Sequence, residues 1–194
     1  NAEGIDRLVE AVAHLGIDVL VNNAGFGAAG RFDRLDGERL RQMVQLNCVA
    51  PVLLTRRFLP AMVARGRGAV IVVGSIAGAQ PLPYHAVYAA TKAFDRCFGE
   101  SLWAEVLGSG VDVLVLEPGT TETEFQAVAG EDPHSGEPPA KVVKLALEAL
   151  GRQPSVVSGW PNWLRVNGAR FLPRSIVALI AGPVMLRRIP AERL

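Results

Sequence analysis

The chain has 194 residues, of which 49% are hydrophobic and 20% are charged, and its formal net charge is +1. This length suffices for one domain with a substantial core, while the near-zero charge gives no support for partners attracted by bulk charge, such as nucleic acid or an anionic membrane. Cys48 and Cys97 are isolated, without CxxC or metal-ligand spacing. We therefore expect two reduced core thiols, no metal site and a cytoplasmic location.

Helical patterns alternate with short apolar strands along the chain. Residues 1–15 predict an amphipathic helix, and residues 17–21 predict a buried strand. The sequence thus opens in the middle of an alternating α/β pattern and lacks an initiator methionine. We expect that an N-terminal segment with the first strands is missing from it.

A glycine-rich stretch follows the first strand, where Gly25, Gly27 and Gly30 match GxGxxG. A dinucleotide-binding turn of this type should open a helix and then a second strand. Residues 31–36 intervene here and a long helix follows, so we favour a different interpretation. Residues 22–25, Asn-Asn-Ala-Gly, predict a turn whose small residues let the backbone approach a ligand closely. The phosphate-binding loop remains the alternative.

Residues 38–65 predict a long helix in which Pro51 places a kink or a tightened turn. Asn47 falls on the apolar stripe of this helix, and a buried amide must find hydrogen-bond partners. One interpretation is that Asn47 satisfies backbone groups opened by the bend. The other is a role in a catalytic site.

The central stretch carries the candidate chemistry. Residues 69–73 predict a buried strand that ends near Ser75, and residues 84–107 predict a helix on which Tyr88 and Lys92 share a face. Ligands of open α/β sheets bind at the carboxyl ends of the strands. A nearby cation lowers the pKa of a phenol from about 10, so Tyr88 could exchange a proton with a substrate oxygen that Ser75 holds. The hydride of such a carbonyl reduction has to come from a cofactor.

The remaining pattern continues the alternation. Residues 111–116 predict a strand that runs into the turn 118–123, residues 140–150 a helix, and residues 155–157 a last strand. The segment 125–139 is rich in glycine, proline and acids, and we expect a mobile loop that could close over substrate. Together these elements predict an α/β fold with a doubly wound, Rossmann-like parallel sheet in a single domain.

In four motifs the chain resembles the short-chain dehydrogenases/reductases (SDR). The residues that carry the resemblance are Asn22-Asn23-Ala24-Gly25, Asn47, Ser75 with Tyr88-x-x-x-Lys92, and Pro118-Gly119-Thr120-Thr121-Glu122-Thr123. A lone YxxxK is weak, but four motifs in order are specific.

The resemblance implies roles for these residues. Tyr88 would be the acid/base, Lys92 its activator and a ribose ligand, Ser75 the group that orients the substrate oxygen, and Asn47 the anchor of a water relay. His85 belongs to no motif, so we expect a surface or pocket-edge residue. The resemblance further implies that NADP or NAD is bound by Asn22, Ala24, Gly25, Tyr88, Lys92, Pro118, Gly119, Thr121 and Thr123.

We expect residues 1–158 to form the core and residues 159–194 a helical extension that covers the substrate cleft or a subunit interface. Trp160, Trp163, Phe171 and Leu172 suggest an apolar pocket wall and thus a hydrophobic or acyl-type substrate. We favour this interpretation over attachment of the extension to a membrane surface.

The resemblance implies an NAD(P)-dependent oxidoreductase that acts on a carbonyl or secondary alcohol as a homodimer or homotetramer. Two alternatives stay open. One is a cofactor-binding or scaffolding homologue without turnover, and the other is an epimerase or dehydratase of the extended branch of the family.

Overall fold

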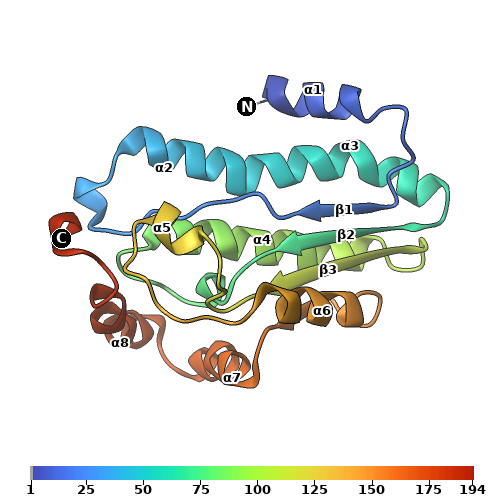
Figure 1. Ribbon diagram of the computed structural model, residues 1–194. Helices are drawn as coiled ribbons and strands as arrows, with labels where there is room; N and C mark the ends of the chain where they lie inside the picture. Colours follow the sequence, from blue (N-terminus) through green and yellow to red (C-terminus); the bar gives the residue numbers. More distant parts are fainter. Residues whose placement is uncertain (1) are drawn as a thin grey trace.

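A four-stranded parallel sheet forms the centre of the computed structural model, which describes residues 2–194. Its strands are β1 (Val19–Asn22), β2 (Gly68–Val73), β3 (Val111–Glu117) and β4 (Ser155–Val157), and they lie in this order across the sheet. Each strand pairs in parallel with the next, so every connection has to cross over the sheet (Figure 1). The predicted α/β class is confirmed.

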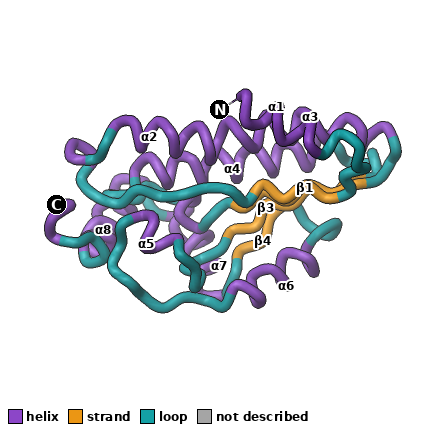
Figure 2. Tube along the Cα trace, turned by 45° about the horizontal axis from the view of Figure 1, so that its top comes forward, coloured by secondary structure: helices purple, strands orange, loops and turns teal. Residues whose placement is uncertain are grey.

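Helices cover both faces of the sheet. α3 (Ala50–Ala64) and α4 (Ala86–Glu105) lie on one face, and α6 (Pro139–Ala149) lies on the other (Figures 1 and 2). α1 (Ala2–Ala11) packs outside α3 and ends four residues before the predicted limit; Asn1, the first residue of that predicted helix, lies outside the described residues. The doubly wound arrangement is therefore confirmed.

The alternation of side chains along β2 separates two core layers. Val70 and Val72 pack with Leu102 on the side of α4, while Ile71 packs with Val142 on the side of α6. Successive residues of a strand point to opposite faces, so a continuous run of valine and isoleucine fills both layers.

The loop after β1 contains the glycine-rich stretch. It continues without helix to the single turn η1 (Phe32–Arg34), and the next helix, α2 (Gly37–Val44), starts well beyond Gly30. The GxGxxG match therefore opens no helix. Asp36 caps α2, because its side chain accepts a hydrogen bond from the amide of Glu38.

The long helix continues through Pro51 by a route that we did not predict. The expected kink is replaced by a π-helical turn, η2 (Gln45–Val49), between α2 and α3. Pro51 has no N–H to donate to the carbonyl of Asn47 four residues earlier, which favours the wider turn. By length and composition alone Gly37–Ala64 could cross a membrane; 22% of its apolar window is buried, and α3 packs against β1 and β2.

The segment between β2 and α4 packs tightly on the helix that follows it. After β2 come Ser75 and the single turn η3 (Ile76–Ala79). A Cβ on Gly78 would lie 2.4 Å from the backbone carbonyl carbon of Lys92, so only glycine permits this approach. Tyr84 has a φ of +64°, which no α-helix tolerates, and α4 therefore begins two residues later than predicted.

The segment 125–139 is more regular than expected. It contains α5 (Phe125–Ala129), and a bridge joins Thr121 to Glu137. Beyond β4 the chain forms α7 (Trp160–Gly168) and α8 (Arg174–Leu186).

The short turns η4 (Ala169–Phe171) and η5 (Ala191–Arg193) complete the C-terminal part. The amide of Arg31 donates to the carbonyl of Arg193, so the C-terminus returns to the loop after β1.

Two expectations about buried side chains are wrong. The predicted pocket wall of Trp160, Trp163, Phe171 and Leu172 is exposed, with Trp160 at 75% and Phe171 at 89%. All four side chains are exposed in the described chain. Both cysteines are free, but Cys97 is exposed and Cys48 only half-buried, so they are not core residues.

Candidate active site

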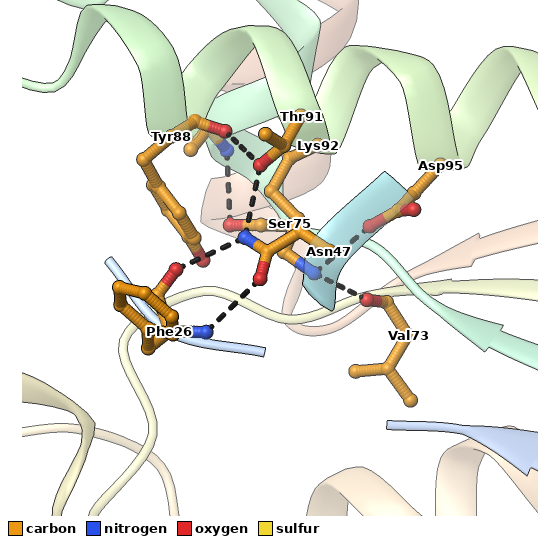
Figure 3. A network of polar contacts seen from close by, with 9 residues as sticks. Phe26, Asn47, Val73, Ser75, Tyr88, Thr91, Lys92 and Asp95 are labelled. Atoms are coloured by element: carbon orange, nitrogen blue, oxygen red, sulfur yellow. Dashed lines mark hydrogen bonds and ion pairs between the residues drawn. The ribbon is translucent and has the colours of Figure 1, made fainter. Parts of the chain in front are cut away.

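The chain folds so that three distant segments meet at the carboxyl end of the sheet. Ser75 follows β2, Tyr88 and Lys92 lie on the first turns of α4, and Asn47 lies in the π-helical turn η2. Figure 3 shows these side chains gathered around the phenol of Tyr88. The predicted convergence of the polar residues is thus present in the geometry.

The Tyr88 phenol is buried in apolar surroundings. Its ring centroid lies 5.1 Å from that of Phe125, and only 9% of the residue is exposed. Burial raises the pKa of Tyr88 above its ordinary value, a hydrogen bond with Ser75 opposes the shift, and the carboxylates of Glu131 and Asp95 add to it. Our expectation of a lowered pKa is therefore wrong for this structure, and Tyr88 is protonated at neutral pH.

Lys92 does not lower the pKa of Tyr88, because the charge of its ammonium is already compensated. Its Nζ donates to the carbonyl of Val73 at 2.7 Å and to Asp95 Oδ2 at 2.9 Å. The exposed fractions of the side chains are 8% for Lys92 and 2% for Asp95, so solvent screens the pair little. The ammonium also lies 6.0 Å from the centroid of the Tyr88 ring. Its charge is therefore directed at a carboxylate and a carbonyl.

Asp95 is a site residue that sequence reasoning missed. Burial raises the pKa of its carboxyl group, and Lys92 opposes this shift through its charge and hydrogen bond. Its second oxygen, Oδ1, is buried without a hydrogen-bond partner within residues 2–194. The available signal was its position three residues after Lys92 on an otherwise apolar face, but such a pair is usually solvated.

Asn47 joins the loop after β1 to α4. Its Oδ1 accepts from the amide of Phe26 at 3.1 Å, while its Nδ2 donates to the carbonyl of Phe26 at 2.9 Å and to Thr91 Oγ1 at 3.0 Å. Thr91 in turn donates to the carbonyl of Tyr88 at 2.8 Å. The buried amide therefore serves backbone groups of a neighbouring loop, rather than groups opened by a bend in its own helix.

The residues of the Asn-Asn-Ala-Gly turn lie beside this network. Asn22 is buried and donates from Nδ2 to Thr55 Oγ1 at 3.0 Å, which leaves its buried Oδ1 without a partner in the described chain. Ala24 and Gly25 are exposed. A Cβ on Gly25 would lie 3.0 Å from Asn47 Oδ1, so the open backbone here depends on glycine.

The turn after β3 adjoins the same site. The amide of Ile76, next to Ser75, donates to the carbonyl of Pro118 at 3.0 Å. Thr121 donates to the carbonyl of Gly119 at 3.3 Å, and Thr123 Oγ1 accepts from the amide of Phe125 at 3.3 Å. The hydroxyl of Thr123 is thus engaged by the first amide of α5 in this structure.

A second polar cluster holds the segment beside Tyr88. His85 is 2% exposed and its Nε2 lies 3.0 Å from Glu131 Oε1, so our expectation of a surface residue is wrong. Arg188 then contacts His134 Nε2 at 3.2 Å. Burial alone would raise the pKa of Glu131, but the hydrogen bond and charge of His85 outweigh it and hold this pKa below its ordinary value. His85 and Glu131 are 46 residues apart in the sequence, so no local pattern indicated that they pair.

Comparison with known proteins identifies the family. The family model of the short chain dehydrogenases matches residues 1–134. The chain belongs to the short-chain dehydrogenase family. It is 32% identical over 163 residues to the bovine dehydrogenase/reductase SDR family member 7B, covering 78% of this chain and 50% of that protein. It is 35% identical over 161 residues to the NADP-dependent 3-hydroxy acid dehydrogenase YdfG of Salmonella typhi, covering 81% of this chain and 65% of that protein.

Solved structures of short-chain dehydrogenases share the fold. A 7beta-hydroxysteroid dehydrogenase matches with a TM-score of 0.81 at 26% identity, over 91% of this chain and 71% of its own. A short-chain dehydrogenase from Sphingobium yanoikuyae in complex with NADPH matches with a TM-score of 0.75 at 27% identity, over 88% of this chain and 70% of its own. The present short-chain dehydrogenase chain spans about half to two thirds of the length of the two curated relatives.

Proposed function

We propose that the intact protein is an NAD(P)-dependent oxidoreductase that interconverts a ketone and a secondary alcohol. The observation that carries this proposal is the convergence of the Ser75 hydroxyl on a buried, protonated Tyr88 phenol beside Lys92. Membership of the short-chain dehydrogenase family supports the same reaction class. So do the relatives whose names specify a hydroxysteroid and a 3-hydroxy acid as substrates.

The residues present fit a nicotinamide cofactor. The buried Asn22 Oδ1 has no partner within residues 2–194, and the backbone at Gly25 is open beside Lys92. The Lys92 ammonium has three N–H donors, of which Val73 and Asp95 use two, so one is left for a ligand hydroxyl. We propose that Asn22, Ala24, Gly25 and Lys92 hold the cofactor, together with the turn that contains Pro118, Gly119, Thr121 and Thr123.

The residues of this chain supply the proton chemistry. When bound, a nicotinamide cofactor supplies the hydride, which no side chain can offer. Tyr88 is the general acid, because its phenol is protonated and lies beside Ser75, where it can donate a proton to a carbonyl oxygen. Ser75 donates a hydrogen bond to the same oxygen and fixes its position. Asn47 holds the loop at Phe26 and, through Thr91, the turn of α4 that carries Tyr88.

We propose a hydrophobic substrate on the basis of the surroundings of Tyr88. Phe125 stacks at an angle against its ring, and Leu82 and Val87 belong to the same apolar cluster. A charged or sugar-like substrate would lose hydration there without gaining polar partners. The apolar cluster around Tyr88, and not the exposed aromatic residues of the C-terminal extension, supports a hydrophobic substrate.

Replacement of Tyr88 by phenylalanine in the intact protein tests the proposal. Acid–base groups contribute about 10²- to 10⁴-fold, so turnover of an apolar ketone with NADPH or NADH should fall at least about 100-fold in Tyr88→Phe. Tyr84→Phe is the matched control, because it removes the chain's other phenol and should keep turnover within about twofold. Cofactor binding, followed by fluorescence, should persist in both variants.

Three outcomes would contradict parts of the proposal. A loss of less than tenfold in Tyr88→Phe would exclude the assigned role. If the wild-type protein binds NADPH without oxidising it in the presence of any ketone, a scaffolding homologue is favoured. Product formation without net change in the cofactor would favour an epimerase or dehydratase.

A further inference from the structure

The C-terminal extension presents an apolar surface that nothing in the described chain covers. We define it as the docking surface, formed by side chains of α7, η4, α8 and the adjoining Leu172. Its apolar members are Trp160, Trp163, Leu164, Phe171, Leu172, Ile176, Leu179, Ile180 and Val184, all classed as exposed. Large apolar side chains exposed in such number on neighbouring elements of one segment indicate an interaction site.

The two sides of α8 show that this exposure is built into the helix. Val177 and Ala181 are buried against the protein, and Gly182 approaches Pro83. The opposite side carries Leu179, which is 72% exposed, and its apolar neighbours. α8 is therefore apolar on both sides, whereas a helix that met only water outside would carry polar residues there.

The charge of the extension selects one kind of partner. Residues 159–190 contain five arginines and no aspartate or glutamate, so the segment carries +5 while the whole chain carries only +1. Arg165, Arg170, Arg174 and Arg187 are exposed, and none forms an ion pair with a carboxylate within residues 2–194. Arg187 follows the last residue of α8 and is exposed.

We propose that the docking surface binds peripherally to an anionic lipid bilayer. Aromatic and aliphatic side chains would enter the interface between headgroups and acyl chains, and the arginines would contact lipid phosphates. A symmetric contact between two copies fits less well, because it would bring like charges together in an interface. α8 has 13 residues and is too short to span the bilayer, for which a helix needs about 20.

The position of the docking surface connects it to the candidate active site. α7 packs against η3, directly after Ser75, and a Cβ on Gly119 would lie 2.2 Å from Asn162 Nδ2. α8 touches Pro83 in the same loop region. Figure 1 shows α7 and α8 along the edge of the molecule opposite β1. A protein bound to a bilayer through the docking surface would thus hold its candidate active site at the lipid boundary. This binding does not depend on turnover.

Sedimentation of the intact protein with vesicles tests this inference. The probes are vesicles of phosphatidylcholine with 30% phosphatidylserine and vesicles of phosphatidylcholine alone, at about 0.1 M salt. The wild type should sediment with the first and much less with the second. Leu179→Glu/Ile180→Glu should lower the partition coefficient at least tenfold. Arg174→Gln/Arg187→Gln should lower it about 25-fold, at roughly fivefold for each arginine near an anionic surface.

Leu107→Glu is the matched control, because Leu107 is 62% exposed and lies just beyond the far end of α4. It should bind vesicles as the wild type does, and circular dichroism should show all variants folded. The proposal is overturned if the wild type ignores anionic vesicles or if Leu179→Glu/Ile180→Glu binds them unchanged. It is also overturned if the wild type is an oligomer that does not bind lipid and Leu179→Glu/Ile180→Glu dissociates this oligomer, since the surface is then a subunit interface.

Discussion

The buried pair of Lys92 and Asp95 gives the sharpest prediction. Asp95→Asn removes the charge that compensates an ammonium of which only 8% is exposed, but leaves the hydrogen bond from Nζ to Val73 at 2.7 Å. Loss of one partner from a buried ion pair costs about 3–5 kcal/mol. We therefore expect a loss of about 3–5 kcal/mol in the free energy of unfolding at pH 7.

Urea denaturation of the intact protein measures this loss, and a double-mutant cycle isolates the pair. Lys92→Met should also be destabilising, because it leaves the Asp95 carboxylate buried without its cation. The double variant Lys92→Met/Asp95→Asn should be more stable than the sum of the single changes by at least about 1.5 kcal/mol, since residues in direct contact couple. A loss below 1 kcal/mol in Asp95→Asn, or an additive cycle, would refute the reasoning.

Three further changes test other parts of the structure. Gly99→Ala would place a Cβ 2.4 Å from Val115 Cγ2, so overpacking should cost about 1–3 kcal/mol in urea denaturation. Burial raises the pKa of Glu117 to about 7, partly opposed by Arg96, so the native carboxyl binds a proton more tightly than the unfolded one. Wild-type stability should therefore fall relative to Glu117→Gln by about 3 kcal/mol between pH 4.5 and 7.5. Asn47→Ala leaves the backbone amide and carbonyl of Phe26 without their hydrogen-bond partner and should lower the free energy of unfolding by about 1–3 kcal/mol.

Each of these changes has a control. Gly37→Ala meets no atom within 4 Å of the new Cβ and should leave stability nearly unchanged. A constant difference between the wild type and Glu117→Gln across the pH range would contradict the raised pKa. Asn47→Asp should cost at least as much as Asn47→Ala, because its carboxylate would be buried against the carbonyl of Phe26, and a smaller loss would point to another cause.

The meeting of the catalytic candidates was predictable because it follows from local geometry. Tyr88 and Lys92 are four residues apart on a helix, and Ser75 ends a strand whose carboxyl end faces the same site. Neither fact requires knowledge of distant contacts. The same holds for the parallel sheet, which follows from the alternation of helices and apolar strands.

The electrostatics of the site were not predictable from the same patterns. A carboxylate three residues after a lysine looks alike in a sequence whether the pair is buried or solvated, so the compensation of Lys92 by Asp95 was missed. His85 and Glu131 meet only because the loop before α4 and the segment after α5 pack together. Solvent exposure of Trp160 and Phe171 likewise depends on how α7 and η4 dock, which composition does not encode.

The π-helical turn that contains Asn47 holds one more residue than an α-helical turn would. Deletion of a single residue within Gln45–Val49 would let α2 and α3 merge into one regular helix. All residues before the deletion would then rotate by about 100° relative to those after it. Both halves would stay helical, yet the amide of Asn47 and the loop at Phe26 would fall out of phase.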